Sequence, residues 1–140
     1  MYTVIRTLFG VAVLVGVALL TRADETNLTN GQLQTKASHI VQGNVKGVYA
    51  SESEADKGVT HYLVEIEVTQ VLKGEGPKSQ EVLHVRCWKR NEESNDPNVK
   101  NGQRRLPDVA QKVQVYLQRG KDGGYDALEP NGIGRPPGKP

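Results

Sequence analysis

The feature that most constrains this chain is a stretch in which apolar and polar side chains alternate, residues 61–72. One set of alternate positions carries Tyr62, Val64, Ile66 and Val68, and the other carries Leu63, Glu65, Glu67 and Thr69. A period of two with β-branched residues is typical of a β-strand that buries one face and exposes the other. The alternation ends after Thr69, because Val71 and Leu72 are both apolar, so we expect a bulge near Gln70.

Three further stretches have the composition of strands, residues 38–50, 80–90 and 125–128. The first contains two glycines, Gly43 and Gly47, and a glycine inside a strand often marks a bulge or a tight bend. In the second, Leu83, Val85 and Cys87 share one face, and Val82, His84, Arg86 and Trp88 share the other. The third follows a predicted tight turn that contains an Asp-Gly pair.

Residues 109–119 fit two patterns. Val109, Val113, Tyr116 and Leu117 lie on one face of a helix, whereas Val113, Val115 and Leu117 alternate as in a strand. We predict a strand from about residue 112, and an alternative is that a helical turn beginning at Pro107 precedes it.

Five strands with a long polar connection between the third and fourth predict a mainly β fold. The connection, residues 91–106, has almost no apolar side chains, and long loops of this kind are often functional or mobile. The spacing favours a five-stranded, partly open OB-like barrel, an architecture that removes most sheet edges by closing on itself. A sandwich of two small sheets is the alternative.

The N-terminal residues have the layout of an export signal. Arg6 precedes an uncharged apolar stretch, and Thr21 and Ala23 stand before the expected cut. We therefore predict a signal peptide over 1–23, a flexible leader over 24–37, a single β-barrel domain over 38–132 and a disordered Pro/Gly tail over 133–140. The expected location is the periplasm or the extracellular medium, with no membrane span after cleavage. The alternative is an uncleaved N-terminal anchor.

Signal cleavage changes the charge balance of the chain. It removes Arg6 and Arg22 but no acidic residue, which leaves 16 of the 18 Lys and Arg against 16 Asp and Glu. A neutral domain lacks the basic surface on which nucleic-acid binders rely, so we do not expect a nucleic-acid partner.

Several segments together resemble a group of small exported bacterial proteins. These segments are residues 68–74, the Val-rich strand 113–117, 123–125 and 131–133. The folds of that group are similar to the OB barrel of the netrin and tissue-inhibitor-of-metalloproteinase superfamily, and the likeness covers about residues 38–133. The resemblance implies an OB barrel and export. Inhibitors of that superfamily chelate a catalytic zinc through an N-terminal Cys, whereas this chain has Asp24 at the predicted mature start.

The outward positions of the second and third strands form the candidate ligand-binding surface. Their side chains are Glu65, Glu67, His84, Arg86 and Trp88. This is the face on which OB barrels usually bind ligands, and a Trp offers a flat apolar plate for a sugar ring or a partner's side chain. The alternative is a set of ordinary cross-strand surface pairs, with Trp88 covering a barrel end or covered by residues 91–106.

We predict no metal site, no cofactor and no catalytic set. The three histidines, His39, His61 and His84, are scattered and lack the convergent spacing of zinc ligands. Cys87 alternates with core positions, which favours a buried core residue over a reactive thiol or an intermolecular disulfide.

The sequence thus predicts an exported small binding or protein-interaction module, not an enzyme, whose partner is a protein or a saccharide. A protease-inhibitor-like module and a small thiol enzyme that uses Cys87 remain as alternatives.

Overall fold

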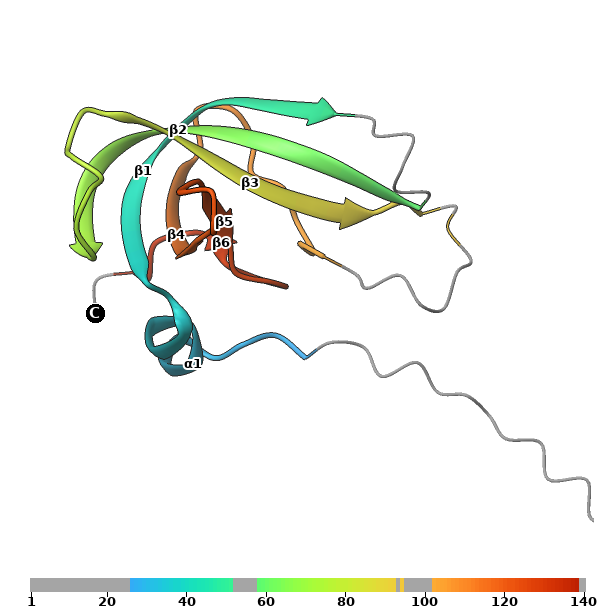
Figure 1. Cartoon of the computed structure of the whole chain (residues 1–140), viewed down its shortest axis with the longest axis horizontal. Coiled ribbons are helices and arrows are strands. Elements are labelled where there is room, and N and C mark those ends of the chain that lie inside the picture. Colours follow the sequence, from blue (N-terminus) through green and yellow to red (C-terminus); the bar gives the residue numbers. More distant parts are fainter. Residues whose placement is uncertain (1–25, 52–57, 93, 95–101, 139–140) are drawn as a thin grey trace, which may run out of the picture.

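The computed structural model describes residues 26–51, 58–92, 94 and 102–138. Its elements are the helix α1 (Asn30–Lys36) and the strands β1 (His39–Ser51), β2 (Val59–Lys73), β3 (Val82–Arg90), β4 (Lys112–Arg119), β5 (Tyr125–Ala127) and β6 (Ile133–Gly134). The long, curved strands β1, β2 and β3 extend past the shorter β4, β5 and β6 (Figure 1). The predicted signal peptide, residues 1–23, lies outside the described residues.

Five strands form a closed ring. The pairing order is β1-β2-β3-β5-β4, and β4 pairs back onto β1 through six residue pairs from His39–Leu117 to Asn44–Lys112. All neighbours are antiparallel except β3 and β5, which pair in parallel at Val85–Tyr125 and Arg86–Asp126. The structure confirms the mainly β, five-stranded OB-like barrel, and β6 adds a sixth strand to β4.

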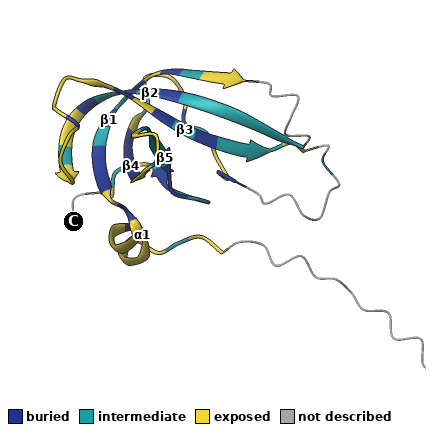
Figure 2. Cartoon of the chain, viewed as in Figure 1, coloured by how far each residue is buried: buried dark blue, intermediate teal, exposed yellow. Residues whose placement is uncertain are grey.

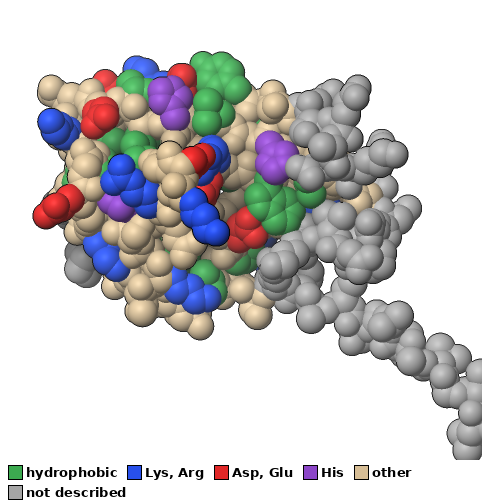
Figure 3. All heavy atoms as spheres, viewed as in Figure 1, with side chains coloured by type: hydrophobic (Ala, Val, Ile, Leu, Met, Phe, Trp, Pro, Cys, Tyr) green, Lys and Arg blue, Asp and Glu red, His purple; other side chains and the backbone are tan. Residues whose placement is uncertain are grey.

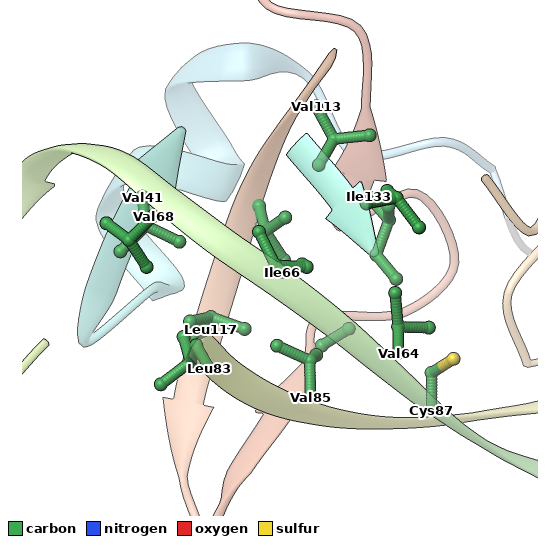
Figure 4. Close-up of a cluster of buried hydrophobic side chains, with 13 residues drawn as sticks. Val41, Val64, Ile66, Val68, Leu83, Val85, Cys87, Val113, Leu117 and Ile133 are labelled. Atoms are coloured by element: carbon green, nitrogen blue, oxygen red, sulfur yellow. The ribbon is translucent and has the colours of Figure 1, made fainter. Parts of the chain in front are cut away.

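The barrel interior is filled by the apolar side chains that alternate along the strands. Val64, Ile66 and Val68 of β2 are fully buried, as the period of two predicts. Figure 4 shows them converging with side chains of the other strands, with Cys87 at one edge of the cluster. Buried residues lie in β1, β4 and β5 and where β2 and β3 pass over them (Figure 2).

The predicted irregularities in β1 and β2 are present. The register between the strands shifts between Gln42 and Gly43, opposite Gln70 and Val68, which confirms the bulge expected near Gln70. Two further shifts lie between Ile40 and Val41 and between Val45 and Gly47. Each extra residue bends its strand, and this bending curves the long β1–β2 pair around the core.

The flexible leader predicted for residues 24–37 is wrong over residues 30–36, which form α1. Thr29 caps the helix, because its side chain accepts a hydrogen bond from the Gln32 amide while the Gln32 side chain accepts one from the Thr29 amide. Leu33 is buried in a second apolar cluster outside the barrel, with Ala37, Ile40, Tyr116 and Leu128. This contact gives a helix of only seven residues the tertiary support that it needs.

The disordered tail predicted for residues 133–140 is wrong at its start. Ile133 and Gly134 form β6 opposite Val115 and Gln114, and the Ile133 side chain joins the barrel core. An apolar side chain that fills a core position is enough to order a short strand beside an existing one.

The helical alternative for residues 109–119 does not hold. Val109 is 62 % exposed and lies in a turn, and β4 begins at Lys112, as the strand alternative predicts. Five consecutive residues of β4, from Val113 to Leu117, are buried, because one face lines the barrel and the other packs under α1. Burial on both faces explains why the sequence of β4 fits both the period of a helix and the period of two of a strand.

Candidate functional site

The five predicted site residues occupy the outer face of β2 and β3. The strand register sets Glu65 opposite His84 and Leu63 opposite Arg86, and His61 lies opposite Trp88. Side chains of both charge signs are interspersed on the visible face (Figure 3). The structure therefore confirms which way these positions face, but it divides them into two groups.

One group forms surface pairs around Glu65. The Tyr49 hydroxyl donates to Glu65 Oε2 at 3.2 Å, and His84 Nε2 lies 3.2 Å from Glu65 Oε1. The charge of Glu65 raises the pKa of the Tyr49 hydroxyl. Glu67 pairs instead with Lys46, at 3.5 Å between Nζ and Oε2. Exposed pairs of this kind contribute little to stability, so this group matches the alternative of ordinary surface pairs.

The other group centres on Arg86, which holds two aspartates. Its Nε and Nη2 donate to the two carboxylate oxygens of Asp126 at 2.7 and 3.0 Å. Its Nη1 donates to Asp122 Oδ2, and Nη2 also donates to Asp122 Oδ1 at 3.1 Å. We call Arg86, Asp122 and Asp126 the Arg86 clamp. The guanidinium lowers the pKa of Asp122 to about 2 and the carboxylates raise the pKa of Arg86, so both charges persist across the neutral range.

The clamp uses most of the hydrogen-bonding capacity of Arg86. A guanidinium has five N–H donors in a fixed fork, and four donor–acceptor contacts run to the two carboxylates. The Gly124 amide adds a hydrogen bond to Asp122 Oδ1 at 3.1 Å. Arg86 therefore ties β3 to β5 and to the turn before it, and acts as a positioning residue and not as an anion receptor.

An open cleft lies next to the clamp, where β3 and β5 separate. The two strands pair at only two positions, and beyond Arg86 and Asp126 they diverge. The space between them is about 310 Å³, at the lower end of the range for ligand sites. We call it the Trp88 cleft; its lining residues are His61, Arg86, Cys87, Trp88, Asp126, Ala127 and Glu129.

Two residues from the end of the predicted long loop hold Trp88 in place. A Cβ atom on Gly102 would lie 2.4 Å from the Trp88 carbonyl oxygen and 2.7 Å from ring atom Cε3, and the Gly102 φ is +64°. Only glycine allows the chain to pass this close in that conformation. Gln103 is 1 % exposed. Its backbone N–H donates to the Trp88 carbonyl oxygen at 2.8 Å, and its side-chain Nε2 donates to the Leu128 carbonyl oxygen at 2.7 Å. Gln103 thereby connects both walls of the cleft.

Cys87 lies at the floor of the cleft and belongs to the core. Its thiol is free and buried, and burial, with a contribution from Glu129, raises its pKa to about 12. This confirms the core interpretation. His84 points to the outer face, opposite Cys87, as the alternation predicts, whereas His61 lines the same cleft as Cys87. A thiol with so high a pKa is protonated near neutral pH, which disfavours a thiolate nucleophile.

The buried thiol gives a pH prediction. Between its ordinary pKa of 9.0 and the folded value of about 12, the unfolded chain releases a proton that the folded chain keeps. The free energy of unfolding is therefore expected to fall as pH rises above about 9, by at most about 1.4 kcal/mol per pH unit from this group. Urea unfolding at several pH values should show a steeper alkaline loss in the natural protein than in Cys87→Ala. If the free energy of unfolding falls equally steeply with pH in both proteins, this prediction is contradicted.

Several residues of the site were not predicted from the sequence. Asp126 and Glu129 reach the cleft only through the β3–β5 pairing, and Gln103 comes from a loop with no apolar pattern. His61 had a usable signal, because it shares the alternate positions of Leu63 and Glu65 and its register partner is Trp88.

Comparison with known protein families, curated proteins and solved structures finds no match to this chain.

Among the described residues, no three His, Cys, Asp or Glu side chains converge as metal ligands would. The only helix described, α1, has seven residues, far fewer than a membrane-crossing helix requires.

Proposed function

We propose that this chain is an exported binding module that holds part of a protein or saccharide partner in the Trp88 cleft. The observation that carries the proposal is the cleft itself, in which an aromatic ring stands beside charged groups already fixed by the Arg86 clamp. Binding sites typically combine an apolar surface with a few well-placed polar groups. Preorganised side chains also reduce the entropy that binding must overcome.

The position of the cleft supports the same function. It opens on the outer face of β2 and β3, where OB barrels usually bind their ligands. The protonated thiol of Cys87 supports binding in preference to thiol catalysis. Export is proposed from the layout of residues 1–23 alone.

Trp88 is the only tryptophan of the chain, so its fluorescence reports directly on the cleft. The protein is screened against a panel of soluble oligosaccharides and short peptides. We expect each compound of the panel that binds in the cleft to change this emission. Calorimetry should then show affinity falling roughly tenfold or more in Trp88→Ala and less in Trp88→Phe, because the loss of a central aromatic contact typically costs 1–2 kcal/mol or more.

Glu67→Gln provides the matched control. Glu67 shares the outer face but pairs with Lys46 and does not line the cleft. Its substitution should leave affinity unchanged. If Glu67→Gln weakens binding and the two Trp88 variants, with folded amide NMR spectra, do not, the proposed site is wrong.

A further inference from the structure

Backbone groups on both sides of the Trp88 cleft are already paired. Lys89, near the end of β3, pairs with Gly102, and the Trp88 carbonyl oxygen accepts a hydrogen bond from the Gln103 backbone N–H. On the facing side, the Leu128 carbonyl oxygen accepts one from Gln103 Nε2. Peptides that bind a sheet usually add a strand to an edge whose backbone groups are free. Because these groups are occupied, the cleft favours a ligand that side chains recognise.

Asp126 offers such a ligand two hydrogen-bond acceptors. Arg86 Nε and Nη2 hold its two carboxylate oxygens at 2.7 and 3.0 Å, and 46 % of the Asp126 side chain is exposed. A carboxylate has about four lone-pair sites, and the contacts to Arg86 use one on each oxygen. Asp126 therefore presents two neighbouring acceptors in a fixed plane. This arrangement suits two adjacent hydroxyl groups, each of which donates one hydrogen bond.

The indole of Trp88 adds a flat apolar surface to the same cleft. The Gly102 backbone lies against it, since a Cβ atom there would be 2.7 Å from ring atom Cε3 and 2.9 Å from Cδ2. This contact holds the ring in one orientation, and both Trp88 and Asp126 line the cleft. The apolar body of an aromatic side chain packs well against another flat apolar surface. The C–H face of a sugar ring is such a surface, and the rim of the ring carries adjacent hydroxyls.

We infer that the Trp88 cleft binds a pyranose unit of a saccharide. This inference rests on the proposed function and assigns its ligand to one of the two classes named there. The C–H face of the sugar ring lies on the Trp88 indole, and two adjacent hydroxyls donate to the Asp126 carboxylate. Neither contact requires a charge on the ligand.

Neutral probes test the inference on the whole protein. Four disaccharides of different stereochemistry and linkage are titrated with Trp88 fluorescence and amide NMR as readouts: cellobiose, lactose, α-mannobiose and N,N′-diacetylchitobiose. Two controls separate the two contacts. Sorbitol has adjacent hydroxyls but no ring, and tetrahydropyran-2-methanol has the ring without adjacent hydroxyls. We expect at least one disaccharide to shift the Trp88 signals and to bind roughly tenfold or more tightly than either control.

The other outcomes separate this inference from the proposed function. If a control binds in the cleft as tightly as the best disaccharide, the inference is overturned. It is also overturned if none of the four disaccharides shifts the Trp88 signals. A short peptide that does shift them would then leave the proposed function standing, with a protein as the partner. If saccharides and peptides both leave the Trp88 signals unchanged while a panel member binds elsewhere, both proposals fail.

A pair of isosteric variants provides the second test. Asp126→Asn and Asp122→Asn each remove one carboxylate from the Arg86 clamp, but only Asp126 lines the cleft. Affinity for the best disaccharide should fall roughly tenfold in Asp126→Asn, the effect of losing a hydrogen bond to a charged acceptor. The loss in Asp122→Asn should be several-fold smaller, because both Asp126 acceptors remain. Equal losses in the two variants, with folded amide NMR spectra, would contradict the role of Asp126 in sugar binding.

Discussion

Gly43→Ala is expected to destabilise the protein by roughly 3 kcal/mol, although it adds a single methyl group. The new Cβ would lie 2.4 Å from the Glu67 carbonyl oxygen and 2.6 Å from Ile66 Cγ2. The carbonyl belongs to the β2 backbone, so it cannot rotate away as a side chain would. Gly43 also pairs with both Val68 of β2 and Val113 of β4. Relief of the clash must therefore push strands apart near the point where the ring closes.

Urea unfolding followed by Trp88 fluorescence measures this effect. The matched control is Gly134→Ala in β6, where an added Cβ has no heavy atom within 4 Å. The control should change the free energy of unfolding by no more than about 0.5 kcal/mol. If Gly43→Ala is as stable as Gly134→Ala, then β1 and β2 do not approach each other as closely as described.

Leu117→Ala is the second substitution with a large expected effect, and it should lower the free energy of unfolding by about 3–4 kcal/mol. Leu117 is fully buried in the barrel core and pairs with His39 of β1 and Ala127 of β5. Truncation leaves a cavity where three strands of the ring meet, and tightly packed strands close such a cavity only partly.

Leu72→Ala makes the same chemical change at a surface position. Leu72 is 45 % exposed, so its truncation should cost about 1 kcal/mol or less. The urea concentrations at the midpoint of unfolding compare the stability of the two variants, provided that the free energy of unfolding depends on urea concentration with the same slope in both. A loss in Leu117→Ala no greater than that in Leu72→Ala would show that residue 117 is not part of a packed core.

Strand positions and faces could be predicted because they depend on local patterns. The period of two along residues 61–72 places Val64 and Ile66 inside and Glu65 outside, and the structure confirms each. Gly43 carried a similar local signal, since a glycine within a strand marks an irregularity. The OB-like barrel followed from the number and spacing of such segments.

The elements that were missed depend on contacts between distant residues. The helix α1 has one buried apolar side chain, Leu33, and its support comes from Tyr116 and Leu128. β6 exists because Ile133 fills a gap beside Val115. Short segments of this kind have no periodicity of their own, and only the finished barrel provides the surface on which they order.

The candidate site was predicted in part for the same reason. Arg86 and Trp88 were placed on the outer face from alternation alone. Their partners were not, because Asp126 is 40 residues from Arg86 in the chain and reaches it through a parallel pairing of only two positions. Sequence alternation identifies which side chains face outward, but the strand order of the closed ring decides which of them share a cleft.

The central claim, that the Trp88 cleft is the ligand-binding surface, is tested most directly by amide NMR of the labelled protein. The single indole N–H signal of Trp88 makes the cleft visible without any mutation. On titration with the tightest-binding panel member, we predict that this signal and the backbone amides of residues 61, 86–88 and 126–129 shift first and furthest. The amides of Tyr49, Glu65 and His84 should stay in place. A saturable binding event that shifts Tyr49, Glu65 and His84 and leaves the Trp88 indole unmoved would contradict the claim.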